Sequence, residues 1–172
     1  MKFLDTSVII LFTDYIPQVC CIDHLHEISN DLKISKNVHN EYYQETTLWI
    51  DENILKKYID NGKISIVKKD LTNDIKKLNL RYPNLHEGEL SIIALGIICK
   101  NLTKEYFCVI DDKNARKIAK NLELELTGSV GLIKLIKNEK NWSSGYLDDV
   151  IENIKESPFF VSDDILKELK ND

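Results

Sequence analysis

The chain has 172 residues, of which 43% are hydrophobic and 30% are charged, and its net charge at neutral pH is −5. This composition excludes a disordered tail, a collagen-like or coiled-coil rod and a small protein held together by disulfides. The negative net charge also excludes a protein that coats nucleic acids by bulk electrostatic attraction.

The cysteines and the apolar runs indicate a reducing compartment and no membrane anchor. Asp5 interrupts the apolar stretch at the N-terminus, and no run approaches the roughly 18 apolar residues that a membrane helix needs. An adjacent cysteine pair and two cysteines inside apolar runs favour free, buried thiols. We therefore expect a cytoplasmic protein with four free cysteines, Cys20, Cys21, Cys99 and Cys108.

Hydrophobic patterns predict alternating strands and helices in the first half of the chain. The strand Lys2–Asp5 leads directly into the apolar helix Val8–Phe12. The following elements are, in chain order, helix Cys21–Ser29, strand Lys33–Ser35, a helix from Val38 with Asn37 as its N-cap, strand Ile64–Val67 and helix Leu71–Leu80.

The second half continues the alternation. The predicted elements are the long apolar helix Glu87–Asn101, the buried strand Tyr106–Ile110, helix Asn114–Asn121, strand Glu123–Thr127, a helix from Gly128 through Leu135, and helices Tyr146–Glu156 and Asp163–Lys170. Parallel strands need helical crossovers, so this alternation predicts a three-layer α/β fold with helices on both faces of a parallel sheet. We expect one domain over residues 1–172, with residues 144–172 as a helical extension packed on it.

Acidic residues follow two of the predicted strands. Asp5 ends the first strand, and Asp111 and Asp112 follow the strand Tyr106–Ile110. Sites in open parallel sheets form beyond the carboxyl ends of the strands, where these acids would meet. Glu41, Glu87 and Glu89 lie near the starts of predicted helices that the same topology can bring to this edge.

Gathered carboxylates repel one another unless a cation lies between them, and oxygen ligands of this kind suit Mg²⁺ or Mn²⁺. Each acid also has a structural alternative. Asp5 and Asp112 are suited to cap helices, and Glu87 and Glu89 to complement a helix N-terminus. Glu41 alone is typical of a solvated helix face.

Four sequence blocks resemble those of PIN-domain nucleases, in particular the single-domain prokaryotic branch related to VapC-type toxins. They are Phe3–Ile10 (FLDTSVII), Gly88–Leu95 (GELSIIAL), Val109–Arg116 (VIDDKNAR) and Thr127–Leu132 (TGSVGL). The sequence has Glu87-Gly88-Glu89 where this branch often has Asp-x-Gly-Glu, which leaves the role of Glu87 open.

The resemblance implies a central sheet of about five parallel strands and a metal-dependent endoribonuclease that cuts single-stranded RNA to 5′-phosphate and 3′-hydroxyl products. It implies Asp5, Glu41, Glu89 and Asp112 as catalytic acids, and Asp5, Glu89, Asp111 and Asp112 around Mg²⁺ or Mn²⁺. It further implies the toxin of a toxin–antitoxin pair, with a small protein antitoxin and a homodimer as partners.

Basic and hydroxyl side chains near the acids are candidate substrate contacts. Lys113 and Arg116 follow the aspartate pair at helical spacing and are expected to guide a phosphate backbone. Lys117 and Lys120 continue that face, although a solvated helix surface is the favoured explanation for these two. Thr6 and Ser7 are candidates to orient a water or a phosphate oxygen, with helix capping as the alternative.

Two other functions remain open from the sequence. In a phosphatase of the haloacid-dehalogenase type, Asp5 would be the nucleophile, but Ser7 stands where that family has a second aspartate. A PIN-like fold that only binds RNA or protein is the non-catalytic alternative.

Overall fold

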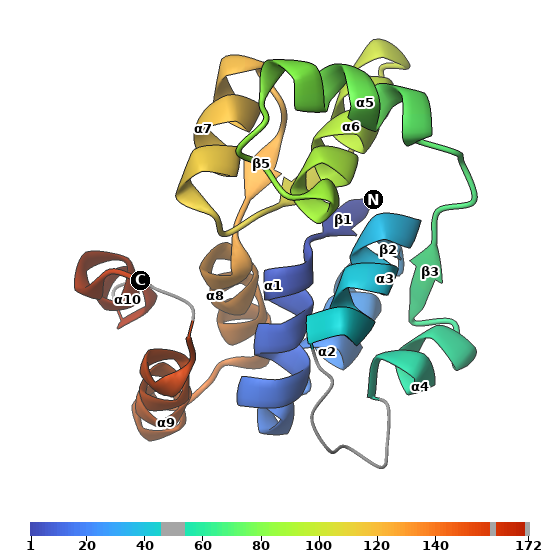
Figure 1. Ribbon diagram of the computed structural model, residues 1–172. Coiled ribbons are helices and arrows are strands. Elements are labelled where there is room, and N and C mark those ends of the chain that lie inside the picture. The colour runs from blue at the N-terminus through green and yellow to red at the C-terminus, as the bar shows by residue number, and fades with distance from the viewer. Residues whose placement is uncertain (46–53, 159–160, 171–172) are drawn as a thin grey trace.

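The computed structural model describes residues 1–45, 54–158 and 161–170 (Figure 1). Its five strands are β1 (Lys2–Leu4), β2 (Leu32–Ile34), β3 (Ile64–Ile66), β4 (Phe107–Val109) and β5 (Leu126–Thr127). All four pairings are parallel, in the order β3-β2-β1-β4-β5. The predicted α/β fold with a five-stranded parallel sheet is therefore confirmed. The strand order reverses at β1. β2 and β3 lie on one side of β1, and β4 and β5 lie on the other.

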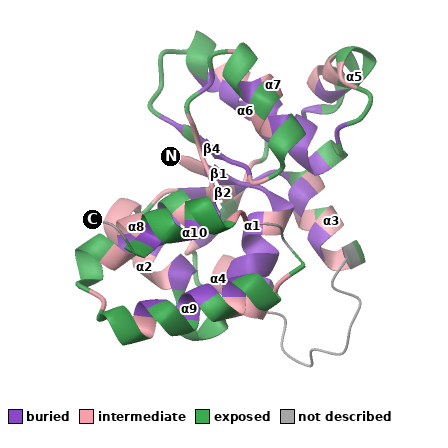
Figure 2. Ribbon diagram, turned by 90° about the vertical axis from the view of Figure 1, so that its left-hand side faces the viewer, coloured by how far each residue is buried: buried purple, intermediate pink, exposed green. Residues whose placement is uncertain are grey.

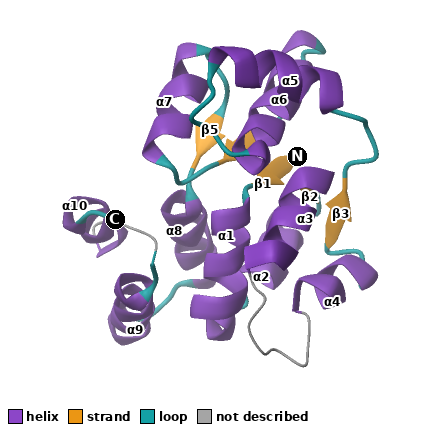
Figure 3. Cartoon of the chain, in the orientation of Figure 1, coloured by secondary structure: helices purple, strands orange, loops and turns teal. Residues whose placement is uncertain are grey.

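Helices connect the strands. They are α1 (Thr6–Ile10), which continues as a π-helix (Leu11–Tyr15), a 3-10 turn (Pro17–Val19), α2 (Cys21–Ser29), α3 (Lys36–Glu45), α4 (Ile54–Asp60), α5 (Thr72–Arg81), α6 (Glu87–Asn101), α7 (Lys113–Asn121), α8 (Ser129–Lys140), α9 (Ser144–Glu156) and α10 (Asp163–Lys170). Figure 3 shows β1 and β5 between these helices and β3 at one edge of the molecule.

The two faces of the sheet are covered by different helices. On one face α6 contacts β1, β4, α5 and α7, and on the other α2 contacts β2 and α8. Figure 2 shows these groups on opposite sides of the buried strands. Because both faces are covered, the strands consist mainly of buried apolar side chains such as Leu4, Ile34 and Val109.

The C-terminal helices pack on the rest of the chain. α9 contacts the π-helix that continues α1, and α10 contacts α8 and α9. Leu147, Ile151 and Ile154 of α9 and Leu166 and Leu169 of α10 are buried in the shared hydrophobic core. The division into one domain with a C-terminal extension stays a prediction.

Several predicted boundaries and one predicted cap are corrected. Ser35, not Asn37, caps α3, since the Ser35 hydroxyl accepts the backbone N–H of Val38 at 2.9 Å. Asn37 lies within the helix. β5 begins only at Leu126 because Glu123 has a left-handed backbone with φ 54°. The helix expected to end at Leu135 runs on to Lys140, and α4 was not predicted from the sequence.

No single helix in the described ranges is long and apolar enough to cross a membrane. Thr6–Tyr15 and Pro17–Ser29, which meet at 87°, pass the length and composition test only as a bent pair. The core helices of soluble proteins pass the same test.

Candidate active site

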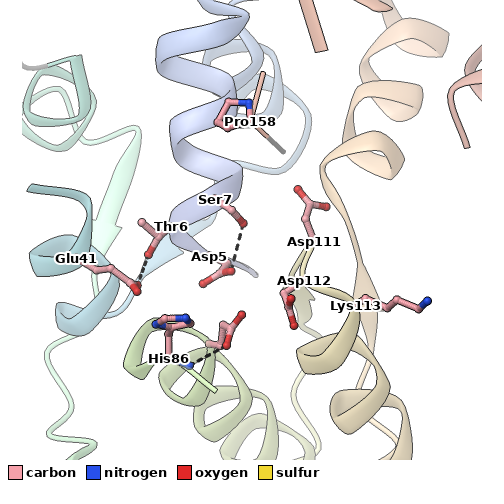
Figure 4. Close-up of a pocket in the computed structure, with 10 residues that line it drawn as sticks. Asp5, Thr6, Ser7, Glu41, His86, Asp111, Asp112, Lys113 and Pro158 are labelled. Carbon is pink, nitrogen blue, oxygen red and sulfur yellow. Dashed lines mark hydrogen bonds between the residues drawn. The ribbon is translucent and has the colours of Figure 1, made fainter. Parts of the chain in front are cut away.

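A pocket of about 400 Å³ lies at the carboxyl ends of β1 and β4. Its lining residues are Asp5, Thr6, Ser7, Glu41, His86, Glu89, Asp111, Asp112, Lys113 and Pro158 (Figure 4). The fold thus brings together all the acids predicted for the site except Glu87. Glu87 instead accepts a hydrogen bond from Asn37 at 3.0 Å on the outer surface.

Asp5 is the most buried acid of this pocket, with 4% of its surface exposed. The Asp5 backbone N–H donates to the Val109 carbonyl at 3.1 Å, which fixes the end of β1 against β4. Asp5 precedes α1, but its side chain makes no capping hydrogen bond. Its Oδ2 accepts from the Ser7 hydroxyl at 3.3 Å, and its buried Oδ1 has no hydrogen-bond partner among the described residues. The capping role considered for Asp5 is therefore not observed.

The acids raise one another's proton affinity. Burial raises the pKa of Asp5 well above its usual value, and the charges of Glu89, Glu41 and Asp111 raise it further. Burial is also the main cause that raises the pKa of Glu89, with Asp112 and Glu41 adding to it. The ionised pocket is therefore electrostatically costly unless a cation compensates it.

Glu89 is held by the first turn of α6. Its Oε2 accepts the backbone N–H of His86 at 2.9 Å, as in the second half of a capping box. This hydrogen bond opposes the rise in the Glu89 pKa that burial causes. One carboxylate oxygen thus supports the helix start, and the other is left for the pocket.

The two aspartates after β4 have different surroundings. Asp112 caps α7, because its Oδ1 accepts the Ala115 N–H at 2.7 Å. Asp111 Oδ1 accepts the Ser129 N–H at 2.8 Å and so joins the end of β4 to the start of α8. Burial raises the pKa of Asp111, while Ser129 and the Arg116 charge oppose the rise. Gly128 permits this approach, since a Cβ there would lie 2.7 Å from Asp111 Oδ1.

Glu41 reaches the pocket from α3. Its Oε2 accepts a hydrogen bond from the Thr6 hydroxyl at 2.5 Å. The same oxygen lies against the backbone of Gly88, where any Cβ would collide with it. The absence of a side chain at Gly88 therefore makes room for the Glu41 carboxylate.

A buried hydroxyl chain joins the two helices that supply the glutamates. The Ser91 hydroxyl of α6 donates to the Gly88 carbonyl at 2.5 Å. It also lies 2.6 Å from the hydroxyl of Ser35, which must then donate to it. Since Ser35 caps α3, this chain fixes α3 and α6 relative to each other and therefore Glu41 relative to Glu89.

A family model described as PIN domain matches residues 1–172. The chain belongs to the PIN domain family. PIN domains form a nuclease superfamily whose members usually use divalent metals. Neither a curated protein nor a solved structure matches the chain.

The pocket of this PIN domain has the donor chemistry of a magnesium or manganese site. Its carboxylate oxygens are hard ligands, and the buried, unpartnered Oδ1 of Asp5 needs a partner that no described side chain supplies. As placed, however, the described residues contain no group of three His, Cys, Asp or Glu side chains that would already hold an ion. A bound cation would draw mutually repelling carboxylates together.

The candidate substrate contacts lie in different places within the PIN domain. Thr6 and Ser7 line the pocket and donate to Glu41 and Asp5. Lys113 is at the rim, with its side chain pointing away from the acids (Figure 4). Arg116 donates to the Ile110 carbonyl at 2.6 Å and so supports the strand end. Substrate contact by these four residues stays a prediction.

Two lining residues were missing from the predicted site. His86 immediately precedes α6 and lines the pocket (Figure 4), and its backbone N–H donates to Glu89. Its position next to the Glu87-Gly88-Glu89 block was the only sequence signal for it. Pro158 follows α9 and reaches the pocket through long-range packing, for which the sequence contains no local signal.

We expect Gly88→Ala to weaken Mn²⁺ binding about tenfold, as the loss of a ligand-orienting contact does in metal sites. The new Cβ displaces the flexible Glu41 carboxylate and breaks its hydrogen bond with Thr6. The lost hydrogen bond and the better helix propensity of alanine nearly cancel, so the free energy of unfolding should change by less than about 1 kcal/mol. Calorimetric Mn²⁺ titration and denaturant unfolding measure the two effects.

Gly145→Ala is the matched control. Gly145 is also the second residue of its helix, α9, but nothing lies within 4 Å of the position of its Cβ. This variant should bind Mn²⁺ as the wild type does. Equal affinity of the Gly88→Ala protein and the wild type would show that Glu41 does not contribute to metal binding.

Proposed function

We propose that this PIN domain is a metal-dependent endoribonuclease that hydrolyses phosphodiester bonds of single-stranded RNA. The observation that carries the proposal is the buried Asp5 carboxylate, whose unpartnered oxygen lies in a pocket with four further acids. A protein retains such mutually destabilising acids where a cation and its chemistry compensate their cost.

The proposed roles of the acids follow from their contacts. Asp5, Glu89 and Asp112 would hold Mg²⁺ or Mn²⁺, each with one carboxylate oxygen outside the hydrogen bonds that fix it. Glu41 would contribute directly or through a water, at the position set by Thr6. Asp111 is likewise held through one oxygen, since its Oδ1 accepts the Ser129 N–H, and its other oxygen remains available to the site.

When bound, the cation supplies an activated water and neutralises charge on the scissile phosphate. The protein supplies the geometry, since the pocket acids come from the ends of β1 and β4 and from α3 and α6. Backbone N–H groups hold the carboxylates of Glu89, Asp111 and Asp112, and hydroxyl groups hold those of Asp5 and Glu41. No side chain has to act as a covalent nucleophile in this reaction. Ser7, which donates to Asp5, would orient the ionised carboxylate or a water.

A toxin role and its partners belong to the same proposal. The resemblance to VapC-type toxins suggests a small antitoxin that blocks the acidic pocket, by a basic group or by occlusion, and a homodimer in the cytoplasm. Their support is the resemblance alone, so the enzymatic activity is the part to test first.

The test compares two substrates with the purified wild-type protein. With Mn²⁺ or Mg²⁺, end-labelled single-stranded RNA should be cut internally to products with 5′-phosphates, and EDTA should stop the cutting. A chromogenic phosphate monoester should not be hydrolysed. Hydrolysis of the monoester without RNA cleavage would favour the phosphatase alternative, and inactivity on both with intact RNA binding would favour a non-catalytic module.

A further inference from the structure

Helix α7 begins at the acidic pocket and carries a row of exposed lysines. Lys113, Lys117 and Lys120 are all exposed and follow one another at intervals of four and three residues. These intervals place them on one face of the helix, over a length of about 10 Å. The opposite face packs inward through the buried Ala115 and Ala119. We call these three lysines the α7 lysine row.

The three lysines of the α7 lysine row have no counter-charge among the described residues, unlike several other lysines of this chain. Lys63, Lys100 and Lys140 pair with carboxylates of Asp23, Glu123 and Glu27. Within the described ranges, no member of the α7 lysine row forms an ion pair or a side-chain hydrogen bond. In a chain with a net charge of −5, the row is an unneutralised positive strip beside a strongly negative pocket.

The pocket alone repels a polyanion, because the five acids that line it face any approaching phosphate. Lys113 lies at the rim and extends outward from the acids, so the positive strip starts where the negative pocket ends (Figure 4). A phosphodiester chain with one phosphate in the pocket would place its next phosphates over the lysines. Lysines attract phosphates as point charges and read no base sequence.

We propose that the α7 lysine row binds the backbone of single-stranded RNA next to the scissile phosphate and thereby anchors the substrate at the pocket. This inference rests on the proposed function for the nature of the substrate. The row extends the substrate contact from Lys113 at the pocket rim to Lys117 and Lys120 outside the pocket. Because lysines read no base sequence, we expect the binding to depend weakly on it.

The test measures binding without cleavage. A short fluorescein-labelled oligouridylate is titrated with protein in EDTA, and the affinity is followed by anisotropy between about 50 and 200 mM KCl. The slope of log K against log salt for single strands is about 0.7 per phosphate contact. The double variant Lys117→Gln/Lys120→Gln should therefore lower the slope by about 1.4 and weaken binding about tenfold at the lowest salt.

The matched control is Lys76→Gln/Lys77→Gln. These two lysines are also exposed, have no ion pair among the described residues and lie on α5, which packs against α6 as α7 does. The control should bind with the slope and affinity of the wild type, and both variants should bind Mn²⁺ like the wild type. A circular dichroism melt verifies that both remain folded.

The outcomes separate this inference from the proposed function. If the α7 variant retains the salt slope of the wild type, the assignment to α7 is overturned. The same holds if the α5 control loses as much of the slope as the α7 variant does. Either result leaves the nuclease proposal standing. An α7-dependent slope in a protein that cuts no RNA supports the anchor and contradicts the nuclease. If the wild type binds no RNA in EDTA, the anchor is overturned, and cleavage of RNA with Mn²⁺ then decides the nuclease proposal separately.

Discussion

Asp5→Asn is expected to stabilise the metal-free protein while it abolishes Mn²⁺ binding and RNA cleavage. The substitution keeps the size of the side chain but removes a buried charge that faces Glu89, Glu41 and Asp111. Since an uncompensated buried charge is costly, the free energy of unfolding at pH 7.5 should rise by on the order of 1–3 kcal/mol. The free energy of unfolding then rises while metal binding and cleavage are lost, which is typical of a functional residue and not of a structural one.

Denaturant unfolding in EDTA and calorimetric Mn²⁺ titration measure the two effects, and Asp14→Asn is the control. Asp14 is a carboxylate outside the pocket that accepts a hydrogen bond from the Thr13 hydroxyl at 2.6 Å. Its replacement should give no gain in stability and should leave Mn²⁺ binding unchanged. Loss of stability in the Asp5→Asn protein, with Mn²⁺ affinity retained, would mean that Asp5 is a structural residue.

Divalent metal is expected to stabilise the protein more at pH 7.5 than at pH 5. The pKa values of Asp5, Glu89 and Asp111 are all raised in the folded state, chiefly by burial. The folded state therefore keeps protons that the unfolded chain releases. The stability that these protonated acids contribute is fully present below about pH 4 and is lost as the pH rises through their raised pKa values.

Metal binding competes with these protons, so it restores the lost stability where the acids are ionised. At a Mn²⁺ concentration of about 100 times Kd the gain is about 2.7 kcal/mol. Thermal unfolding at the two pH values, with Mn²⁺ and with EDTA, measures it. A Mn²⁺ shift in Tm that is equal at both pH values, or larger at pH 5, would contradict a site built from these acids.

The sheet and most of the acids were predictable because their signals are local. Strands covered on both faces are short apolar runs, and an acid that directly follows such a run lies at the carboxyl edge of a parallel sheet. Asp5, Asp111 and Asp112 meet this condition, and the structure places all three in one pocket. Glu89 followed from the Gly88-Glu89 pair at the start of a long apolar helix.

The remaining features depend on contacts between residues far apart in the sequence. The sequence does not show that Thr6 and Gly88 make the position for Glu41, because three separate elements contribute to it. Pro158 reaches the pocket only because α9 and α10 pack against the other helices. Capping by Ser35 in place of Asn37 depends on where β2 ends, a boundary that hydrophobic pattern resolves poorly.

The proposed function places a metal-dependent ribonuclease site in the pocket around Asp5. The most direct measurement is cleavage of end-labelled single-stranded RNA with Mn²⁺ by the wild type and by the Asp5→Asn and Asp112→Asn variants, purified in parallel, with EDTA as the blank. We predict internal cutting by the wild type alone, which EDTA abolishes. Cutting that survives in both variants, or that persists in EDTA, would contradict the site.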